Sequence, residues 1–238
     1  MKESRVPLVE SSGVSTDISA ADSRIVFGYA GAIGNAVDLS KFNGSWSNYL
    51  SADDDDDLDG FTDFTLEMWT RQEEWGGSSS VNPILLAKRS TTACSYHWYC
   101  KQVGDSRAAN MVLSTNVTAY SDLTGNTTSP ILGQWTHQAY VRNTSENHIY
   151  SFLNGAITYT RPNSFGENTI GATDERLSFG SGNRGGVFPG QIDEVRISRV
   201  ARSSDWIKAT HDCVTEANFA TYSKAKATTS RASVLIFN

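Results

Sequence analysis

The acidic run at residues 53–63 has the residue types and spacing of a cation-binding loop. Its carboxylates recur at alternating positions and once more near the end of the run, at Asp55, Asp57, Asp59 and Asp63. Counted from Asp55, they occupy positions one, three, five and nine of a calcium loop of the EF-hand kind, with glycine at position six. Position twelve is Leu66 instead of an acid that binds through both oxygens. The run therefore predicts either a calcium site or a hydrated acidic turn that leads into the next strand.

Asp193 is a second candidate ligand for a cation. It begins an alternating pattern in which Val195 and Ile197 follow on the same face of a strand. If that face packs on the core, the carboxylate must be paired, hydrogen-bonded or bound to a metal. We rank Asp193 above the acidic run as a calcium ligand, because the carboxylates of the run can remain hydrated.

Groups suited to catalysis are sparse. Hydrolysis of a glycoside with retention needs two carboxyl groups about 5 Å apart, and Glu67 has no acidic residue two positions away on its strand-like run. The histidines, at His97, His137, His148 and His211, have no metal-binding spacing, and no Gly-x-Ser-x-Gly pattern supplies a serine nucleophile. His137 follows a tryptophan in a strand-like run, which favours a hydrogen-bonded structural histidine. We expect a protein that is not an enzyme.

The candidate ligand contacts are aromatic residues in predicted loops: Trp46, Trp75, Tyr96 and Trp98. An exposed ring offers an apolar face to the C–H groups of a sugar, while a nearby Asn or Asp hydrogen-bonds its hydroxyls. The same rings would serve equally well to pack over an edge of the fold.

Cys94 and Cys100 enclose a segment short enough to be the tip of a hairpin. A disulfide between them would suit an oxidising compartment, and the alternative is two unlinked thiols on neighbouring strands. With the disulfide formed, Cys213 is left as a free thiol or as a partner for another chain.

The composition favours strands and turns over long helices. Hydrophobic residues make up 39% of the chain, enough for a large core, and 19 Gly and 5 Pro accompany many Ser and Thr. The net charge of −6, without a basic stripe, argues against nucleic-acid binding. No run reaches the roughly 20 apolar residues that cross a bilayer, and no secretory signal is visible at the N-terminus.

Short alternating runs recur along the chain and predict a sandwich of strands. Phe64, Leu66 and Met68 share one face of the first clear run, and residues 135–141 repeat the pattern. Clusters of Gly, Ser and Asn separate such runs. One short helix is expected at residues 203–209, where a serine can cap the first turn.

The motifs of these runs, taken in order, resemble laminin-G-like domains of the concanavalin A-like lectin/glucanase superfamily, of the type found in large bacterial surface proteins and in some phage particles. The matching segments are residues 34–39, 47–50, 64–69, 84–88, 133–137 and 150–155. The most specific is the closing pattern at residues 188–207, FPGQIDEVRISRVARSSDWI, which is similar to the family's last strand and helix. The resemblance covers residues 8–212. It implies an all-β, two-sheet antiparallel jelly roll with one short C-terminal helix.

The resemblance also bears on the sites. Relatives with glycosidase activity carry a Glu-x-Asp-x-x-Glu run on one strand, and this chain lacks such a run. In other relatives the aspartate at the start of the last strand contributes to a calcium site together with backbone carbonyls near the N-terminus. The resemblance implies that role for Asp193 alone, and a structural hydrogen bond to a turn is the alternative.

These observations predict one domain at residues 1–213 and a C-terminal extension at residues 214–238 that serves contacts between subunits or with a larger assembly. The predicted function is a non-enzymatic recognition or adhesion module on a cell or virion surface, or outside the cell, that binds a glycan or a protein, with Ca²⁺ as the candidate cofactor. The alternatives are a structural subunit or decoration protein of a virion or extracellular filament, and a degenerate glycosidase. Neither nucleic-acid binding nor membrane insertion is expected.

Overall fold

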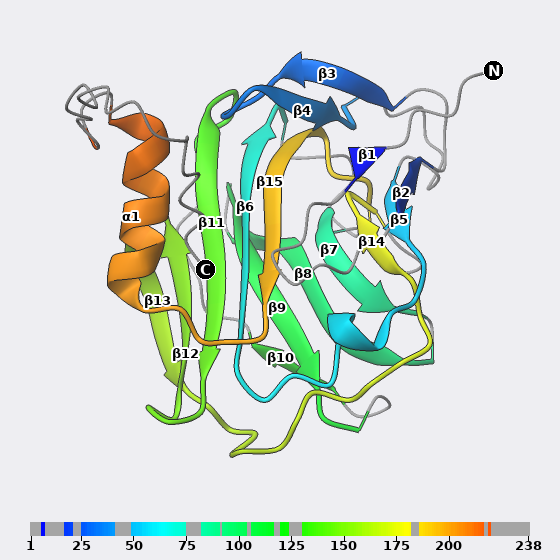
Figure 1. The fold of residues 1–238 in the computed structure, drawn as a ribbon, viewed down its shortest axis with the longest axis vertical. Helices are drawn as coiled ribbons and strands as arrows, with labels where there is room; N and C mark the ends of the chain where they lie inside the picture. Colours follow the sequence, from blue (N-terminus) through cyan, green and yellow to red (C-terminus); the bar gives the residue numbers. More distant parts are fainter. Residues whose placement is uncertain are drawn as a thin grey trace, which may run out of the picture.

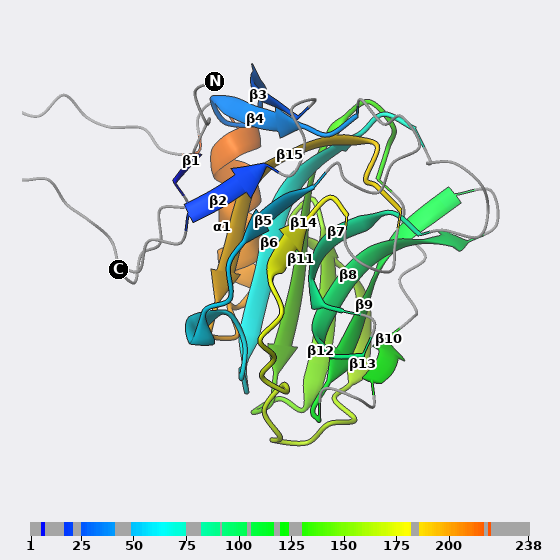
Figure 2. The same ribbon diagram turned by 90° about the vertical axis from the view of Figure 1, so that its right-hand side faces the viewer.

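Two antiparallel β-sheets stacked face to face form the protein (Figure 1, Figure 2). The computed structural model describes residues 6–7, 17–20, 25–40, 49–74, 82–90, 92–103, 106–116, 120–123, 130–181, 186–216 and 219. All pairings between the named strands are antiparallel. The predicted all-β, two-sheet antiparallel jelly roll is confirmed.

The first sheet, which we call the front sheet, has eight strands in the order β1 (Val6–Pro7), β2 (Asp17–Ala20), β5 (Leu50–Ala52), β14 (Leu177–Phe179), β7 (Ile84–Arg89), β8 (Cys94–Val103), β9 (Ser106–Ser114) and β10 (Tyr120–Leu123). The second, the back sheet, has seven strands in the order β13 (Ala156–Pro162), β12 (His148–Leu153), β11 (Trp135–Asn143), β6 (Phe64–Gln72), β15 (Gly190–Ser198), β4 (Asn35–Asp38) and β3 (Val26–Ala30). Spatial neighbours such as β6 and β15 are far apart in sequence, so each sheet forms only when distant segments meet.

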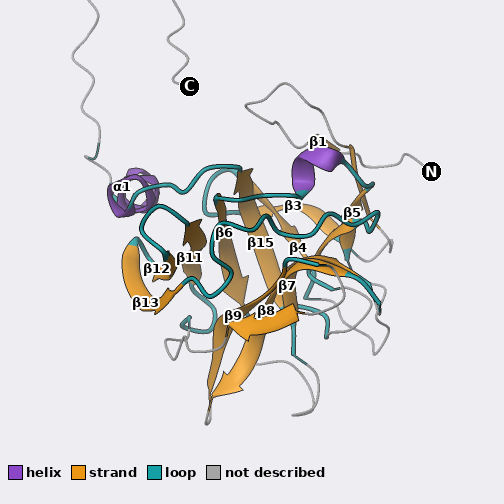
Figure 3. Ribbon diagram, turned by 90° about the horizontal axis from the view of Figure 1, so that it is seen from below, coloured by secondary structure: helices purple, strands orange, loops and turns teal. Residues whose placement is uncertain are grey.

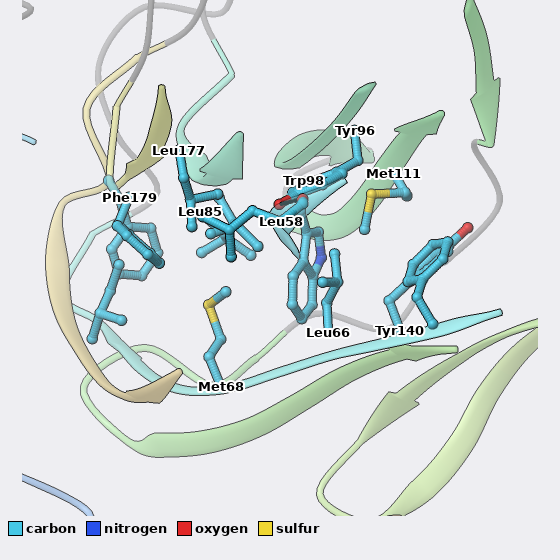
Figure 4. Packing of buried hydrophobic residues seen from close by; sticks show 14 of the residues in the cluster. Leu58, Leu66, Met68, Leu85, Tyr96, Trp98, Met111, Tyr140, Leu177 and Phe179 are labelled. Atoms are coloured by element: carbon cyan, nitrogen blue, oxygen red, sulfur yellow. Dashed lines mark hydrogen bonds between the residues drawn. The ribbon is translucent and has the colours of Figure 1, made fainter. Parts of the chain in front are cut away.

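Alternation along the strands places one side of each sheet in a shared core. In β6, Phe64, Leu66 and Met68 are fully buried between the sheets, as their period of two predicts. Figure 4 shows Leu66 and Met68 facing side chains of the front sheet, among them Trp98 and Leu177. Full burial of each such side chain contributes about 1.5–3 kcal/mol, so this layer supplies the main driving force for stacking the sheets.

The predicted helix is confirmed as α1 (Ser204–Thr215), which lies on the outer face of the back sheet (Figure 1, Figure 3). The Ser203 hydroxyl accepts the Trp206 N–H at 3.2 Å and caps the first turn. Ile207 packs into a small cluster with Val141 of β11 and Phe152 of β12. The helix extends beyond the predicted segment because residues 210–215 contain neither Gly nor Pro.

Several predictions fall at or beyond the edge of the described residues. The boundary placed after Cys213 lies in the last turn of α1. Most of the predicted extension, residues 217–218 and 220–238, lies outside the described residues, as do Trp46 and Trp75. The roles assigned to these segments stay predictions. Among the described residues, no helix is long and apolar enough to cross a membrane.

Candidate functional site

A row of small and polar side chains crosses the outer face of the front sheet. It joins directly paired residues of neighbouring strands: Ser51 of β5, Ser178 of β14, Ala87 of β7, His97 of β8 and Val112 of β9. The residues that flank His97 in sequence belong to the core, so the period of two places this row on the opposite face. All members of the row are buried.

Tyr99 and Asn110 are directly paired two residues further along the same face. The rings of His97 and Tyr99 stack with centroids 4.9 Å apart and an interplanar angle of 26°. Tyr99 also packs with Cys94 and Val112 in a small apolar cluster. With Arg89 at the end of β7, these side chains form what we call the front-sheet cluster: Ser51, Ala87, Arg89, His97, Tyr99, Asn110, Val112 and Ser178.

Arg89 holds His97 in one chemical state. Its Nη1 lies 2.7 Å from His97 Nδ1, and a guanidinium group can only donate. Nδ1 therefore accepts, and the neutral imidazole carries its hydrogen on Nε2. Burial, reinforced by the positive charge of Arg89, lowers the pKa of His97 from 6.5 to about 3. The ring is thus neutral across the physiological pH range, and the half-buried Arg89 connects it to the surface.

The prediction that Tyr96 and Trp98 are loop aromatics is wrong. Both lie within β8 and face the core, with 0% and 1% of their surface exposed. Tyr96 donates its hydroxyl hydrogen to the Leu58 carbonyl at 2.8 Å. Rings occupy both faces of β8 here, and this hides the period of two in the sequence. Alternation counted from Trp98 would have identified His97 and Tyr99 as the outward-facing pair.

The predicted disulfide between Cys94 and Cys100 is also wrong. Both residues are free thiols on the single strand β8, not on neighbouring strands. An extended segment of that length separates the two Cα atoms by about 20 Å, whereas a disulfide needs less than about 7 Å. The hairpin instead joins β8 to β9. Burial raises the pKa of Cys94 to about 11, so its thiol stays protonated.

The four candidate ligands of the acidic run each have a different partner in the structure. Asp55 caps the short 3-10 helix η1 (Asp56–Leu58) by accepting the Asp57 N–H at 2.8 Å. Asp57 pairs with Arg199 at 2.9 Å, and Asp63 accepts the Thr144 N–H at 2.8 Å. In the part of the chain that the structure describes, no three His, Cys, Asp or Glu side chains are arranged to hold a metal ion. The nearby cations and N–H groups offset the mutual repulsion of the run.

Asp59 forms a buried ion pair with Lys88 of β7. Lys88 Nζ lies 2.9 Å from Asp59 Oδ2, and both side chains are buried. The same ammonium group contacts Asp54 and donates to the carbonyls of Thr173 and Glu175. Asp59 Oδ2 also accepts the Thr173 N–H at 2.8 Å. The pair therefore ties the acidic turn, β7 and the segment before β14 together.

The face predicted for Asp193 is wrong, because a β-bulge interrupts β15 directly after it. The pairing with β6 shifts register between Asp193 and Arg196, and Glu194 adopts a φ of +48°. Val195 and Ile197 pack against the core. Asp193 precedes the bulge and lies on the outer face of the back sheet, although it is buried there.

The Asp193 carboxylate anchors the turn between β3 and β4. Oδ2 accepts the Ile33 N–H at 3.0 Å, and Oδ1 accepts the Glu194 N–H at 2.9 Å. A Cβ atom on Gly31 would clash with Oδ2, so the turn approaches this closely because residue 31 is glycine. Burial raises the pKa of Asp193, and the backbone donors oppose that shift. Asp193 is thus hydrogen-bonded to a turn, and its binding of calcium stays a prediction.

If the protein binds a cation, we expect it to be calcium and to stabilise the protein through Asp193 more than through the acidic run. Calcium at 100 times its Kd stabilises a native state by about 2.7 kcal/mol, or a rise of about 5–10 °C in Tm for a domain of this size. Differential scanning fluorimetry of EDTA-treated protein should show this rise, its loss in Asp193→Asn and its retention in Asp57→Asn. If the rise is kept in Asp193→Asn and lost in Asp57→Asn, calcium binds at the acidic run instead. A wild-type Tm that calcium leaves unchanged would refute calcium binding.

Glu67, the nearest candidate for a catalytic acid, lies on the outer face of the back sheet, where α1 packs. Oε2 is 3.5 Å from His137 Nε2, and Oε1 is 3.7 Å from Arg196 Nη1. Both Glu67 and His137 are buried, and the His137 ring packs on Trp69 with centroids 5.2 Å apart. His211 of α1 stacks on the same tryptophan at 14°. The Glu67 carboxylate thus lies beside the side chains of His137 and Arg196. The stacking of His211 on Trp69 next to them indicates that this group of side chains holds α1 on the sheet.

The sequence and the fold both match known proteins. A family model described as the concanavalin A-like lectin/glucanases superfamily matches residues 43–208, more than half of the chain. No curated protein matches the sequence.

Solved structures share the fold at low identity. The binding domain of Paraclostridial mosquitocidal protein 1 matches 89% of this chain and 52% of its own, with a TM-score of 0.66 and 12% identity. Domain 4 of an extracellular arabinanase from Geobacillus stearothermophilus, in complex with arabinotriose, matches 83% of this chain and 89% of its own, with a TM-score of 0.60 and 17% identity. The ligand-binding domain of botulinum neurotoxin serotype D, in complex with N-acetylneuraminic acid, matches 85% of this chain and 47% of its own, with a TM-score of 0.61 and 13% identity. This chain spans about half the length of the two toxin domains.

Proposed function

Because this chain belongs to the concanavalin A-like lectin/glucanase superfamily, we propose that it is a non-enzymatic recognition module that binds a glycan. The observation that carries the proposal is the front-sheet cluster, in which the Tyr99 ring stacks beside the neutral His97. A ring face suits the C–H groups of a sugar, and fixed donors and hydroxyls suit its oxygens. Tyr99 and His97 are each only 5% exposed, so a sugar reaches the two rings only when the residues that cover this face move aside.

The ligand class and the location are supported by similar structures. The arabinanase domain was solved with arabinotriose and the neurotoxin domain with N-acetylneuraminic acid, which supports a sugar as the ligand. The arabinanase is extracellular, which supports a place outside the cell or on a cell or virion surface. The absence of catalysis is supported by Glu67, whose ion-pair partners are His137 and Arg196 and not a second carboxyl group.

We expect isothermal titration calorimetry to detect binding of arabinotriose or N-acetylneuraminic acid, with the sugar recovered intact. Tyr99→Ala should weaken the Kd about tenfold, because it removes the ring face that contacts the sugar. The matched control is Tyr150→Ala, which removes a ring from β12 of the back sheet and should leave the Kd unchanged.

A different outcome would favour one of the alternatives. If neither sugar binds, a glycan array detects no ligand, and the protein forms oligomers at every concentration, a structural subunit of a virion or filament is the better account. Sugar that is cleaved during the titration would instead indicate a glycosidase.

A further inference from the structure

We propose that His97 is a dedicated hydrogen-bond donor of the glycan site, whose Nε2–H binds an acceptor oxygen of the sugar beside Tyr99. This inference rests on the proposed function and deepens it, because it names the atom that the ligand must satisfy. It requires that Nε2 carries a hydrogen, that the protein leaves this hydrogen without an acceptor, and that the ring stays neutral.

The contact with Arg89 fixes the position of the hydrogen. Arg89 Nη1 donates to Nδ1 at 2.7 Å, so Nδ1 has no hydrogen of its own and Nε2 must carry it. A cation that donates to one nitrogen draws electron density from the ring. This makes the Nε2–H a stronger donor, since linked hydrogen bonds polarise one another.

The described part of the chain supplies no acceptor for this hydrogen. His97 is only 5% exposed, and its Nε2 is buried without a hydrogen-bond partner among the described residues. The residues directly paired with His97 are Ala87 on β7 and Val112 on β9, whose aliphatic side chains cannot accept. Buried polar groups in native proteins are rarely left without partners. A sugar oxygen can complete this bond once the residues over Nε2 move aside, because the atom is buried in the free protein.

The surroundings of His97 also keep the ring in this state. The titratable and charged groups described around it are Arg89 on β7 and Cys94 and Tyr99 on its own strand. The positive charge of Arg89 disfavours a second positive charge on the His97 ring. Cys94 stays protonated, and therefore uncharged, because burial raises its pKa to about 11. The carboxylate-bearing residue of the same row, Asp122 of β10, is paired with Val112 and so lies two strands, about 10 Å, from His97. Ligand affinity should therefore show no histidine titration between about pH 5 and pH 8.

The required ligand chemistry is an acceptor oxygen next to an apolar sugar face. A hydroxyl or ring oxygen of a neutral sugar provides it, and so does the carboxylate of an acidic sugar. Arabinotriose and N-acetylneuraminic acid represent these two sources, and the one whose affinity depends on His97 identifies the acceptor.

The test compares two substitutions of His97 in the full chain by titration calorimetry with both sugars. His97→Phe keeps the ring but removes the donor, and it should weaken the Kd about tenfold or more. His97→Gln places an amide N–H near the position of Nε2 and should stay within about threefold of the wild type. The control is His148→Phe on β12 of the back sheet, which should leave the Kd unchanged.

A ligand-free readout keeps the inference testable if a variant folds poorly. Nitrogen-15 NMR of the wild type should show the Nε2–H tautomer of His97 without titration from pH 5 to pH 8, and the sugar should shift the Hε2 signal. An Nδ1–H tautomer, or a titration near pH 6.5, would overturn the inference by itself. Wild-type binding that His97→Phe leaves unchanged would overturn this inference alone, whereas failure of the wild type to bind any glycan would remove the proposed function as well.

Discussion

Replacing Arg142 with methionine is expected to lower the free energy of unfolding by about 3–5 kcal/mol. Arg142 of β11 has no exposed surface. Its guanidinium donates to the carbonyls of Thr62 at 2.8 Å, Gly166 at 3.1 Å and Asn168 at 2.7 Å, and more weakly to Phe61 at 3.4 Å. One side chain thus satisfies acceptors in two loops, which a backbone hydrogen bond from Ile170 to Phe61 also joins. Methionine fills similar volume but leaves the carbonyls of Thr62 and Asn168 without this donor, whereas those of Phe61 and Gly166 keep the N–H groups of Ile170 and Asn163. Each carbonyl left unsatisfied costs about 1–3 kcal/mol before the loops relax.

Guanidinium chloride unfolding followed by circular dichroism measures this effect. Arg142→Lys should recover only a small part of the loss, because a compact ammonium group cannot reach both loops as the planar guanidinium does. The matched control is Arg161→Met on the edge strand β13, which should change stability by less than about 0.5 kcal/mol. If Arg142→Met remains within about 1 kcal/mol of the wild type, water must satisfy the carbonyls, and Arg142 is not the anchor of these loops.

The sequence predicts this fold wherever the two faces of a strand differ in polarity. Phe64, Leu66 and Met68 of β6 share the core face, and counting every second residue finds that face correctly. In β8 the same count fails, because Tyr96 and Trp98 face the core while His97 and Tyr99 face outward. Large rings on both faces erase the contrast on which the method depends.

The bulge in β15 defeats periodicity for a different reason. The extra residue at Glu194 shifts the strand by one position, so Asp193 and Val195 face opposite sides of the back sheet. A bulge depends on how a strand pairs with its neighbour, and that pairing is not visible in the segment itself.

The residues of the candidate site could not be grouped from any single segment of the sequence. Ser51, Ala87, His97 and Ser178 become neighbours only through pairing across β5, β14, β7 and β8. Each is an ordinary residue in its own segment, and their common row is a property of the sheet order. The histidines are visible in the sequence, but the arginine that fixes the tautomer of His97 reaches it across a strand pair.

The partners of the acidic run are likewise not visible in its own segment. Taken alone, its carboxylates repel one another and favour a bound cation. The structure brings Lys88 and Arg199 to them from β7 and from the segment after β15. The charge balance of a loop therefore depends on strands that the loop does not contain.

Replacing Lys88 with methionine should destabilise the protein by about 3–5 kcal/mol, because it leaves the buried Asp59 carboxylate charged and unpaired. The carbonyls of Thr173 and Glu175 lose their donor in the same substitution. Urea unfolding of the single and double variants measures the coupling. The double variant Lys88→Met with Asp59→Leu should be more stable than the sum of the single losses predicts, because removing both partners leaves no isolated charge. The control is Arg176→Met, whose exposed pair with Asp53 should contribute less than about 1 kcal/mol.

The same variant separates the two interpretations of the acidic run. If Lys88 acts as a built-in cation for Asp54 and Asp59, its removal leaves carboxylates that a free cation could bind. Calcium should then raise the Tm of Lys88→Met by more than it raises that of the wild type. Equal shifts in both proteins would show that the lysine does not occupy a latent cation site. A Lys88→Met variant as stable as the wild type without calcium would contradict the buried ion pair itself, because an unpaired carboxylate at this depth must cost free energy.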